Sequence, residues 1–368
     1  MDIKTMTRAG LAGLAAYRPG KPIATLLKEK GIESAIKLAS NENPLGASPL
    51  AVEAARAAAV DLNRYPEGSG AAVRDRLAGL YGISADEIIL GSGSSEVLAL
   101  ALSAFVDPGE EVVLPTPSFS IYGTLVLAAG GTPVPVRLEP DFSYNLKEFE
   151  KRLSERTKAV ILCSPNNPTG TIVRKADLRA FAAGLPRRTL LVLDEAYAEY
   201  AESPDFESGL TFFRERPLVV ARTFSKLYAL AALRIGYAVS GRVIIEEMNK
   251  IRPPFNTTVP AQAAAAAVLD DRKFIAASLK NNREGKEFLG RALAGLKLDF
   301  TPSEANFILV DFQGGAPEIC ARLEDLGVIV RPLDNPELRA RYLRVTVGTP
   351  AENRRFIEGL RTVLGPAG

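Results

Sequence analysis

The sequence predicts an α/β protein of two domains, the larger one built on a mainly parallel β-sheet. Short apolar runs alternate with longer segments of helical periodicity, and continuous apolar runs are typical of strands buried on both faces of a sheet. At 368 residues the chain exceeds what one hydrophobic core usually supports. The strands predicted for the larger domain are residues 87–90, 111–114, 159–163, 190–193, 218–221 and 237–240.

The domain junction is predicted at the paired prolines of Ile251-Arg-Pro-Pro-Phe-Asn256. A long Ala-rich helical stretch from residue 259 to about residue 298 follows them. We therefore assign residues 46–255 to the larger domain and residues 256–368 to a smaller α+β domain. The first 45 residues, punctuated by Pro and Gly, are expected to form an arm that packs on the small domain or on a partner. Strands of the small domain are predicted at residues 306–311, 328–331 and 342–347.

Charge and hydropathy exclude several classes of partner. The 45 basic and 43 acidic residues nearly cancel and form no long run of one sign, which argues against nucleic acid or an anionic membrane as the main partner. No stretch approaches the roughly 20 apolar residues that span a bilayer. The apolar segment at residues 9–16 is too short and too weakly hydrophobic for a signal peptide, so a cytoplasmic location is expected. Cys163 and Cys320 lie outside any CxxC spacing and are expected to be buried, reduced thiols.

The chain contains no histidine. A Ser-His-Asp or Cys-His apparatus and a histidine-ligated zinc site are therefore impossible, and we expect no metal site. Proton transfer must fall to another side chain. A lysine qualifies when burial or nearby positive charge lowers its pKa towards the working pH.

Lys226 is the candidate base, in the segment Arg222-Thr-Phe-Ser-Lys-Leu-Tyr-Ala-Leu-Ala-Ala-Leu-Arg234 that follows a predicted strand. Its neighbours Thr223 and Ser225 carry hydroxyls, and Arg234 lies eight residues further on. This set describes a cofactor aldehyde held as an imine, with its phosphate neutralised nearby. The segment therefore points to pyridoxal phosphate, although Arg234 taken alone would more often be a surface ion-pair residue.

Polar groups also follow three other predicted strands. Asp194 can pair with a pyridinium nitrogen and Tyr197 with a ring phenolate oxygen, the alternatives being a helix cap and a packing residue. The turn Ser164-Pro-Asn-Asn-Pro-Thr-Gly170 can aim Asn167 inward, or be an ordinary turn. The loop Gly91-Ser-Gly-Ser-Ser-Glu96 opens a helix and lets backbone N–H groups approach a phosphate, but lacks the spacing of a dinucleotide fingerprint or a P-loop.

Together these segments resemble those of fold-type I aminotransferases, a pyridoxal-phosphate-dependent superfamily, and most closely its histidinol-phosphate aminotransferase branch. The resemblance runs from about Tyr17 to the end of the chain and implies a seven-stranded sheet in the larger domain. The further motifs that carry it are Tyr17-Arg-Pro-Gly-Lys-Pro, Asn41-Glu-Asn-Pro-Leu-Gly46, Arg64-Tyr-Pro-Glu67, Pro117-Ser-Phe-Ser-Ile-Tyr122 and Leu343-Arg-Val-Thr-Val-Gly348.

The resemblance implies a role for each candidate residue. Lys226 forms the Schiff base, Asp194 pairs with the pyridine nitrogen, Tyr197 and Asn167 bind the phenolate oxygen, and Phe119 stacks on the ring. The residues implied to hold the phosphate are Ser94, Ser95, Thr223, Ser225 and Arg234, together with Tyr65 from the neighbouring subunit of a homodimer.

Arg344 and Arg331 resemble the arginines that bind the substrate's anionic groups in this branch, and Tyr17 is expected against the substrate's imidazole end. A guanidinium pairs bidentately with carboxylate or phosphate, so two arginines suit a site that serves both anions. Without the upstream motifs, two exposed arginines would be the simpler interpretation. One departure is that Ala229 and Ala232 stand where the family often has glycine, and we expect ordinary helical φ at both.

The predicted reaction is transamination of L-histidinol phosphate with 2-oxoglutarate, giving imidazole acetol phosphate and glutamate in a step of histidine biosynthesis. An aromatic amino-acid aminotransferase and a phosphothreonine decarboxylase on the same scaffold remain alternatives. A non-catalytic regulator that binds pyridoxal phosphate or a nucleotide fits poorly, since such a protein needs neither a base nor a substrate-binding arginine pair.

Overall fold

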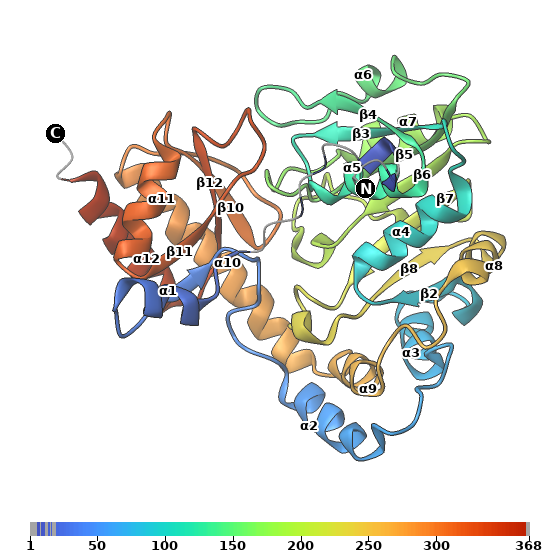
Figure 1. Ribbon diagram of the computed structural model, residues 1–368, viewed down its shortest axis with the longest axis horizontal. Helices are drawn as coiled ribbons and strands as arrows, with labels where there is room; N and C mark the ends of the chain where they lie inside the picture. Colours follow the sequence, from blue (N-terminus) through green and yellow to red (C-terminus); the bar gives the residue numbers. More distant parts are fainter. Residues whose placement is uncertain (1–5, 8, 12–13, 15, 17–19, 366–368) are drawn as a thin grey trace.

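Two β-sheets organise the computed structural model, which describes residues 6–7, 9–11, 14, 16 and 20–365 (Figure 1). The prediction of an α/β fold is confirmed. The larger sheet has seven strands: β2 (Ile88–Gly91), β3 (Glu111–Thr116), β4 (Thr132–Arg137), β5 (Thr157–Cys163), β6 (Leu190–Asp194), β7 (Leu218–Thr223) and β8 (Gly236–Ser240). The five strands of the smaller sheet are β1 (Ile36–Leu38), β9 (Asp299–Thr301), β10 (Phe307–Asp311), β11 (Val328–Pro332) and β12 (Tyr342–Thr346).

The strands of the larger sheet lie in the order β2-β8-β7-β6-β5-β3-β4. All neighbours are parallel except β8, which is antiparallel to both β2 and β7. Sequence analysis missed β4, whose Thr-Pro-Val-Pro-Val-Arg sequence carries two prolines. The prolines are tolerated because β4 is an edge strand that pairs only with β3.

Helices cover both faces of the larger sheet. One face packs on α4 (Ser94–Phe105), α5 (Ile121–Ala129) and α8 (Arg242–Ile251), and the other on α3 (Ala71–Tyr81), α7 (Lys175–Gly184) and α9 (Val259–Val268). The remaining helices are α1 (Ile23–Lys30), α2 (Pro49–Ala58), α6 (Leu146–Glu150), α10 (Arg272–Gly295), α11 (Ala316–Asp325) and α12 (Pro350–Leu364). The two-sided burial explains why the central strands read as unbroken apolar runs.

The register of β5, β6 and β7 aligns the carboxyl ends of these three central strands. Cys163 at the end of β5 pairs with Asp194 at the end of β6, and Asp194 pairs in turn with Ala221 of β7. The polar segments that follow β5, β6 and β7 therefore meet at one edge of the sheet, where ligands bind in folds of this kind.

The smaller sheet has the order β1-β11-β12-β10-β9. Its first strand comes from the segment near the amino terminus, where Ile36–Leu38 pairs in parallel with β11. The antiparallel pairing of β11 with β12 brings Arg331 directly opposite Arg344. Two arginines thirteen residues apart in sequence are thus cross-strand neighbours.

The helical stretch predicted from residue 259 to about residue 298 consists of two helices. Helix α9 ends at Val268, and α10 starts at Arg272 because Asp271 accepts a hydrogen bond from the backbone N–H of Phe274 at 3.0 Å. Ala261 of α9 lies in the same hydrophobic core as the strands of the larger sheet, whereas α10 runs on to the smaller sheet (Figure 1). The predicted boundaries after residues 45 and 255 stay predictions.

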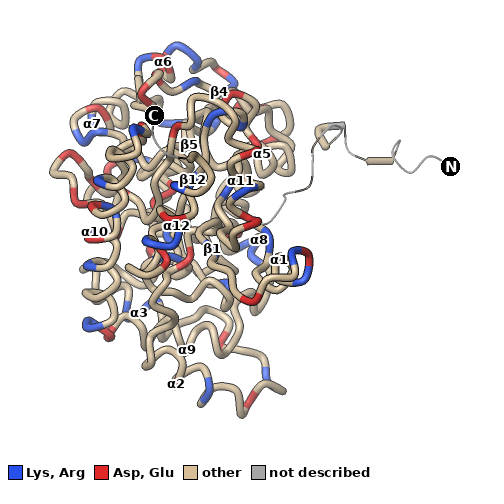
Figure 2. The backbone as a smooth tube through the Cα atoms, turned by 90° about the vertical axis from the view of Figure 1, so that its left-hand side faces the viewer, with Lys and Arg blue, Asp and Glu red and all other residues tan. Residues whose placement is uncertain are grey.

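Charges are interspersed over the chain, with basic and acidic residues on the same elements (Figure 2). Within the part of the chain that the structure describes, no helix combines the length and apolar composition that crossing a membrane requires. Cys163 and Cys320 are both buried free thiols, as predicted.

Candidate active site

A cavity of about 280 Å³ opens at the carboxyl ends of β5, β6 and β7, beside the first turn of α4. Residues from both sheets and from the segment after β1 line it. It brings together eleven of the predicted residues: Ser94, Ser95, Phe119, Asn167, Asp194, Tyr197, Thr223, Ser225, Lys226, Arg234 and Arg344.

Lys226 lies in the turn after β7, with its ammonium group facing the cavity. Desolvation by the surrounding protein, reinforced by the positive charge of Arg344, lowers the pKa of Lys226 to about 7. Its Nζ donates a hydrogen bond to the Ser40 carbonyl at 3.2 Å and lies 5.6 Å from the centre of the Tyr197 ring. A substantial fraction of the amine is therefore neutral, and can accept a proton, near neutral pH.

Asp194 lies on the floor of the same cavity and is almost fully buried. Tyr122 donates a hydrogen bond to Asp194 Oδ2 at 2.7 Å, and the backbone N–H of Ala196 donates to Oδ1 at 3.1 Å. Burial raises the pKa of Asp194 and outweighs these two hydrogen bonds, which act to lower it. A carboxylate held in this way is stabilised by any cation brought next to it.

Tyr197 forms the centre of a polar chain on the cavity wall. Its hydroxyl accepts hydrogen bonds from Asn41 Nδ2 at 2.9 Å and from Asn167 Nδ2 at 3.4 Å. Asn167 Oδ1 in turn accepts from Arg344 Nη1 at 2.6 Å, and Arg344 Nη2 donates to the Ala39 carbonyl at 2.7 Å. Burial raises the pKa of the Tyr197 hydroxyl, so it stays protonated.

The far end of the cavity is built to receive an anion. Ser94 and Ser95 form the first turn of α4, and within the described chain no side chain caps this helix at Gly93. The backbone N–H groups of the first turn are thus available to a ligand. Arg234 lies so near that a Cβ on Gly93, which has φ +84°, would come within 2.8 Å of Arg234 Nη2. A Cβ on Gly236 would lie 2.5 Å from the nitrogen of Ser94, so only glycines leave room for this loop.

The expected helical φ at Ala229 is wrong. Ala229 has φ +57°, in the left-handed region, whereas Ala232 lies within the 3-10 helix η7 (Ala231–Leu233). Ala229 precedes Leu230, whose backbone N–H donates to the carbonyl of Phe224 at 2.9 Å and closes the loop of residues 224–230. The chain reverses at Ala229 within this loop, in a conformation that costs alanine more than glycine.

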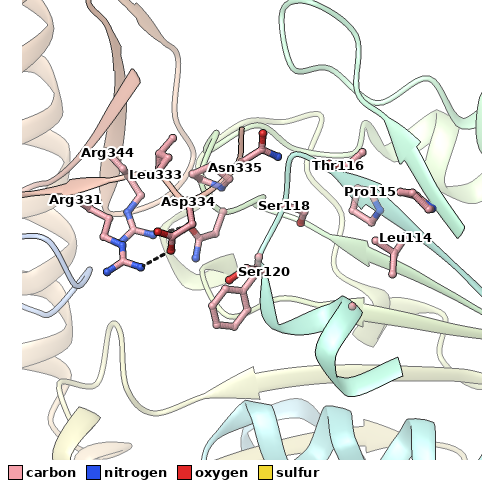
Figure 3. A pocket seen from close by; sticks show the side chains of 15 residues that line it. Leu114, Pro115, Thr116, Ser118, Ser120, Arg331, Leu333, Asp334, Asn335 and Arg344 are labelled. Atoms are coloured by element: carbon pink, nitrogen blue, oxygen red, sulfur yellow. Dashed lines mark hydrogen bonds and ion pairs between the residues drawn. The ribbon is translucent and has the colours of Figure 1, made fainter. Parts of the chain in front are cut away.

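A second cavity of about 340 Å³ adjoins the first and shares Phe119, Asn167 and Arg344 with it. Arg331 and Arg344 extend into it side by side from the smaller sheet, and Ser118 and Ser120, from the segment between β3 and α5, also line it (Figure 3). Asp334 pairs with Arg331 at 3.2 Å, and its side chain is 60% exposed. The two cavities form one region that leads from Lys226 to two guanidinium groups.

Two predicted residues are not part of this region. Tyr65 is 80% exposed and stacks on Phe255, with ring centroids 4.6 Å apart and an angle of 18° between the rings. Its predicted reach to a partner's site stays a prediction. Tyr17 lies outside the described residues.

Two further residues at the cavity were not predicted from the sequence. Tyr122, the partner of Asp194, and Asn41, the partner of Tyr197, lie in motifs that the resemblance already used. Their presence in those motifs was the available signal, but nothing local in the sequence pairs them with residues 72 and 156 positions away.

The arrangement suits a flat, anionic, aldehyde-bearing cofactor. It offers a lysine amine, an aromatic face, a buried carboxylate opposite, and an anion site at a helix terminus with an arginine beside it. Among the described residues, no group of three or more acidic or cysteine side chains is placed to hold a metal ion. The residues therefore fit pyridoxal phosphate.

Comparison with known proteins agrees with this geometry. A histidinol-phosphate aminotransferase of Caldicellulosiruptor saccharolyticus is 40% identical over 98% of this chain and 100% of its own length. Histidinol-phosphate aminotransferase 1 of Nitrosococcus oceani is 43% identical over 98% of this chain and 97% of its own.

Solved structures are similar throughout the fold. The histidinol-phosphate aminotransferase of Sinorhizobium meliloti, in complex with pyridoxal-5'-phosphate, has a TM-score of 0.87 and 27% identity, with 97% of each chain covered. Aspartate aminotransferase of Thermus thermophilus with maleate has a TM-score of 0.80 and 25% identity, covering 94% of this chain and 97% of that one. The family model of class I and II aminotransferases matches residues 33–360, and the chain belongs to this family.

Proposed function

We propose that the protein catalyses transamination between L-histidinol phosphate and 2-oxoglutarate, with pyridoxal 5'-phosphate as cofactor, giving imidazole acetol phosphate and L-glutamate. The observation that carries the proposal is the continuous region that begins at Lys226 and ends at the cross-strand pair Arg331 and Arg344. The names and full-length similarity of the relatives support the choice of substrate.

The cofactor, when bound, supplies an aldehyde that takes up the amino group and a ring that withdraws electrons from the reacting carbon. Lys226 and Asp194 both line the cavity, where Lys226 would bind that aldehyde and Asp194 would pair with the ring nitrogen. Tyr122 orients the Asp194 carboxylate through its 2.7 Å hydrogen bond, and Phe119 offers a face for stacking. The phosphate would be held by lining residues of the same cavity: Ser94, Ser95, Thr223, Ser225 and Arg234.

Lys226 moves the proton. With the cofactor bound, the neutral amine of Lys226 would take the proton from the substrate carbon that bears nitrogen and would later give it back. A pKa of about 7 lets one group do both near neutral pH. The carbonyl of Ser40 and the ring of Tyr197 hold the amine at the centre of the cavity.

Arg344 and Arg331 bind the substrate anions. Arg344 is fixed by Asn167 and by the Ala39 carbonyl, so its guanidinium is oriented before substrate arrives. Arg331 lies opposite it and pairs with the exposed Asp334 carboxylate, which a substrate phosphate or carboxylate would replace. The pair therefore serves the phosphate of one substrate and the carboxylates of the other. We propose that Tyr17 lies against the imidazole.

We also propose that the protein works as a homodimer in the cytoplasm. Val60, Leu62 and Tyr65 are 79%, 64% and 80% exposed, and Phe255 beside Tyr65 is 44% exposed, which is typical of a surface covered by a partner. Tyr65 would then reach the phosphate bound by the other subunit. Two buried, unpaired cysteines fit a reducing compartment.

The test is the amount of glutamate formed from 2-oxoglutarate by protein loaded with pyridoxal phosphate and given one amino donor at a time. We expect the highest kcat/KM with L-histidinol phosphate, parallel-line kinetics, and no turnover after Lys226→Ala. Glutamate from phenylalanine or tyrosine but none from histidinol phosphate would transfer the assignment to an aromatic aminotransferase. Carbon dioxide released from phosphothreonine would identify a decarboxylase.

A further inference from the structure

The loop before α4, residues 91–93, is fixed by the side chain of Glu96, a residue in the first turn of that helix. Glu96 Oε2 accepts a hydrogen bond from the backbone N–H of Ser92 at 2.6 Å. On the opposite side the loop packs directly on β8, where a Cβ on Gly236 would lie 2.7 Å from the carbonyl carbon of Gly93. The position of Glu96 therefore sets the position of the N–H groups that face the phosphate end of the cavity.

Asn256 fixes Glu96 in turn. Its Nδ2 donates to Glu96 Oε2 at 2.6 Å and to the Leu90 carbonyl at 3.2 Å, and its Oδ1 accepts from Arg252 Nη1 at 2.8 Å. The amide thus supplies donors for the carboxylate and the backbone carbonyl and an acceptor for the guanidinium. An aspartate would set two carboxylates against each other.

The segment that carries Asn256 also holds the segment that carries Tyr65. Phe255 stacks on Tyr65 at 4.6 Å, and Arg252 Nη1 donates to the Gly68 carbonyl at 2.9 Å. Phe255 has φ +57°, an uncommon conformation for an aromatic residue, and it directly precedes Asn256. The side-chain contacts at residues 252 and 256 hold the backbone on either side of this residue.

We infer that Asn256 is a positioning residue of the cofactor site: it fixes the phosphate-binding loop through Glu96 and couples that loop to the Tyr65 segment through Phe255. This inference rests on the proposed function. Asn256 does not line the cavity, so it acts on the cofactor only through the loop. In the proposed dimer, Asn256 then positions both the phosphate-binding loop of its own subunit and the Tyr65 that reaches the partner's site.

The experiment compares Asn256→Asp with Asn249→Asp in the full chain. Asn249 is an exposed residue of α8 whose Oδ1 accepts a hydrogen bond from Nε of the same Arg252 at 2.9 Å. The dissociation constant of pyridoxal phosphate is measured by titrating each apoprotein and following absorbance. We expect Asn256→Asp to raise this constant about 10-fold or more, from the loss of a hydrogen bond to a charged group. Asn249→Asp should stay within about 2-fold, as exposed substitutions usually do.

Three further readouts complete the test. At saturating cofactor, kcat of Asn256→Asp should stay within about 3-fold of the parent, because the reacting groups are untouched. Asn256→Ala should weaken cofactor binding in the same direction without added charge, and it carries the test if the aspartate variant does not fold. In a double-mutant cycle, Asn256→Ala should reduce the effect of Tyr65→Phe on the same dissociation constant.

Unchanged cofactor affinity in both Asn256 variants, or an equal loss in Asn249→Asp, would overturn the inference. Additive effects in the cycle would remove the link to Tyr65. A parent protein that binds no pyridoxal phosphate would instead overturn the proposed function, so the two failures are distinguishable.

Discussion

Replacing Lys226 by methionine should stabilise the apoprotein, and the gain should depend on pH. The lysine is partly buried and lies near Arg344, so its ammonium form is unfavourable in the folded state. Methionine keeps the length of the side chain and removes the charge. A residue needed for chemistry is expected to cost stability in this way.

The size of the effect follows from the pKa of Lys226. A fall from 10.5 to about 7 on folding corresponds to a penalty of at most about 4 to 5 kcal/mol. Water in the open cavity reduces this penalty, and we expect a gain of about 1–3 kcal/mol. Because the pKa of a cationic group is lowered, the penalty is complete below about pH 7, where the ammonium form is present in both states. It fades as pH rises from about 7 towards 10.5, since the folded state is then neutral while the unfolded state still binds a proton.

The assay is urea unfolding of the cofactor-free parent and Lys226→Met proteins at several pH values between about 6 and 10. The matched control is Lys273→Met, the same change at an exposed position of α10, which should alter the free energy of unfolding by no more than about 0.5 kcal/mol at any pH. A Lys226→Met protein that is less stable than the parent at pH 6, or whose gain does not shrink on raising the pH, would refute this account of the lysine.

Four other substitutions test the site. Ala229→Gly should stabilise the protein by about 0.5–1 kcal/mol, because glycine tolerates the φ of +57° at this position. Ala232→Gly, in the adjacent 3-10 helix, should destabilise the protein by a similar amount. Changes of the same sign in the free energy of unfolding would contradict the different backbone conformations of the two residues. Tyr122→Phe removes the hydrogen bond to buried Asp194 and should weaken cofactor affinity about 10-fold in an absorbance titration, so unchanged affinity would count against its orienting role. Asp334→Asn removes an exposed carboxylate that competes with substrate anions and should raise kcat/KM for histidinol phosphate about 1.4- to 5-fold, whereas a decrease would show that this carboxylate assists binding.

The strands at the centre of the larger sheet could be predicted because their signal is local. β5, β6 and β7 are largely apolar runs followed by polar turns, and burial on both faces, which spares only Lys158 of β5, requires that composition. β4 and β1 could not be predicted in the same way. Their burial is partial and their pairing depends on a neighbour far away in sequence.

The sequence alone determined which chemistry is available. A chain without histidine, with Lys226, Asp194 and the hydroxyls beside Lys226 after successive strands, has few ways to move a proton, and the type and order of its residues are enough to indicate the cofactor. These features can be recognised from their order in the sequence because the carboxyl ends of parallel strands meet at one edge of the sheet.

Only the tertiary structure decided how these groups act on one another. The register of β11 with β12 places Arg331 opposite Arg344, and the loop that Leu230 closes has Ala229 in the left-handed region. The pKa of Lys226 likewise depends on desolvation by segments distant in sequence. Register, backbone strain and desolvation arise from contacts between remote parts of the chain, so residue type at a single position does not encode them.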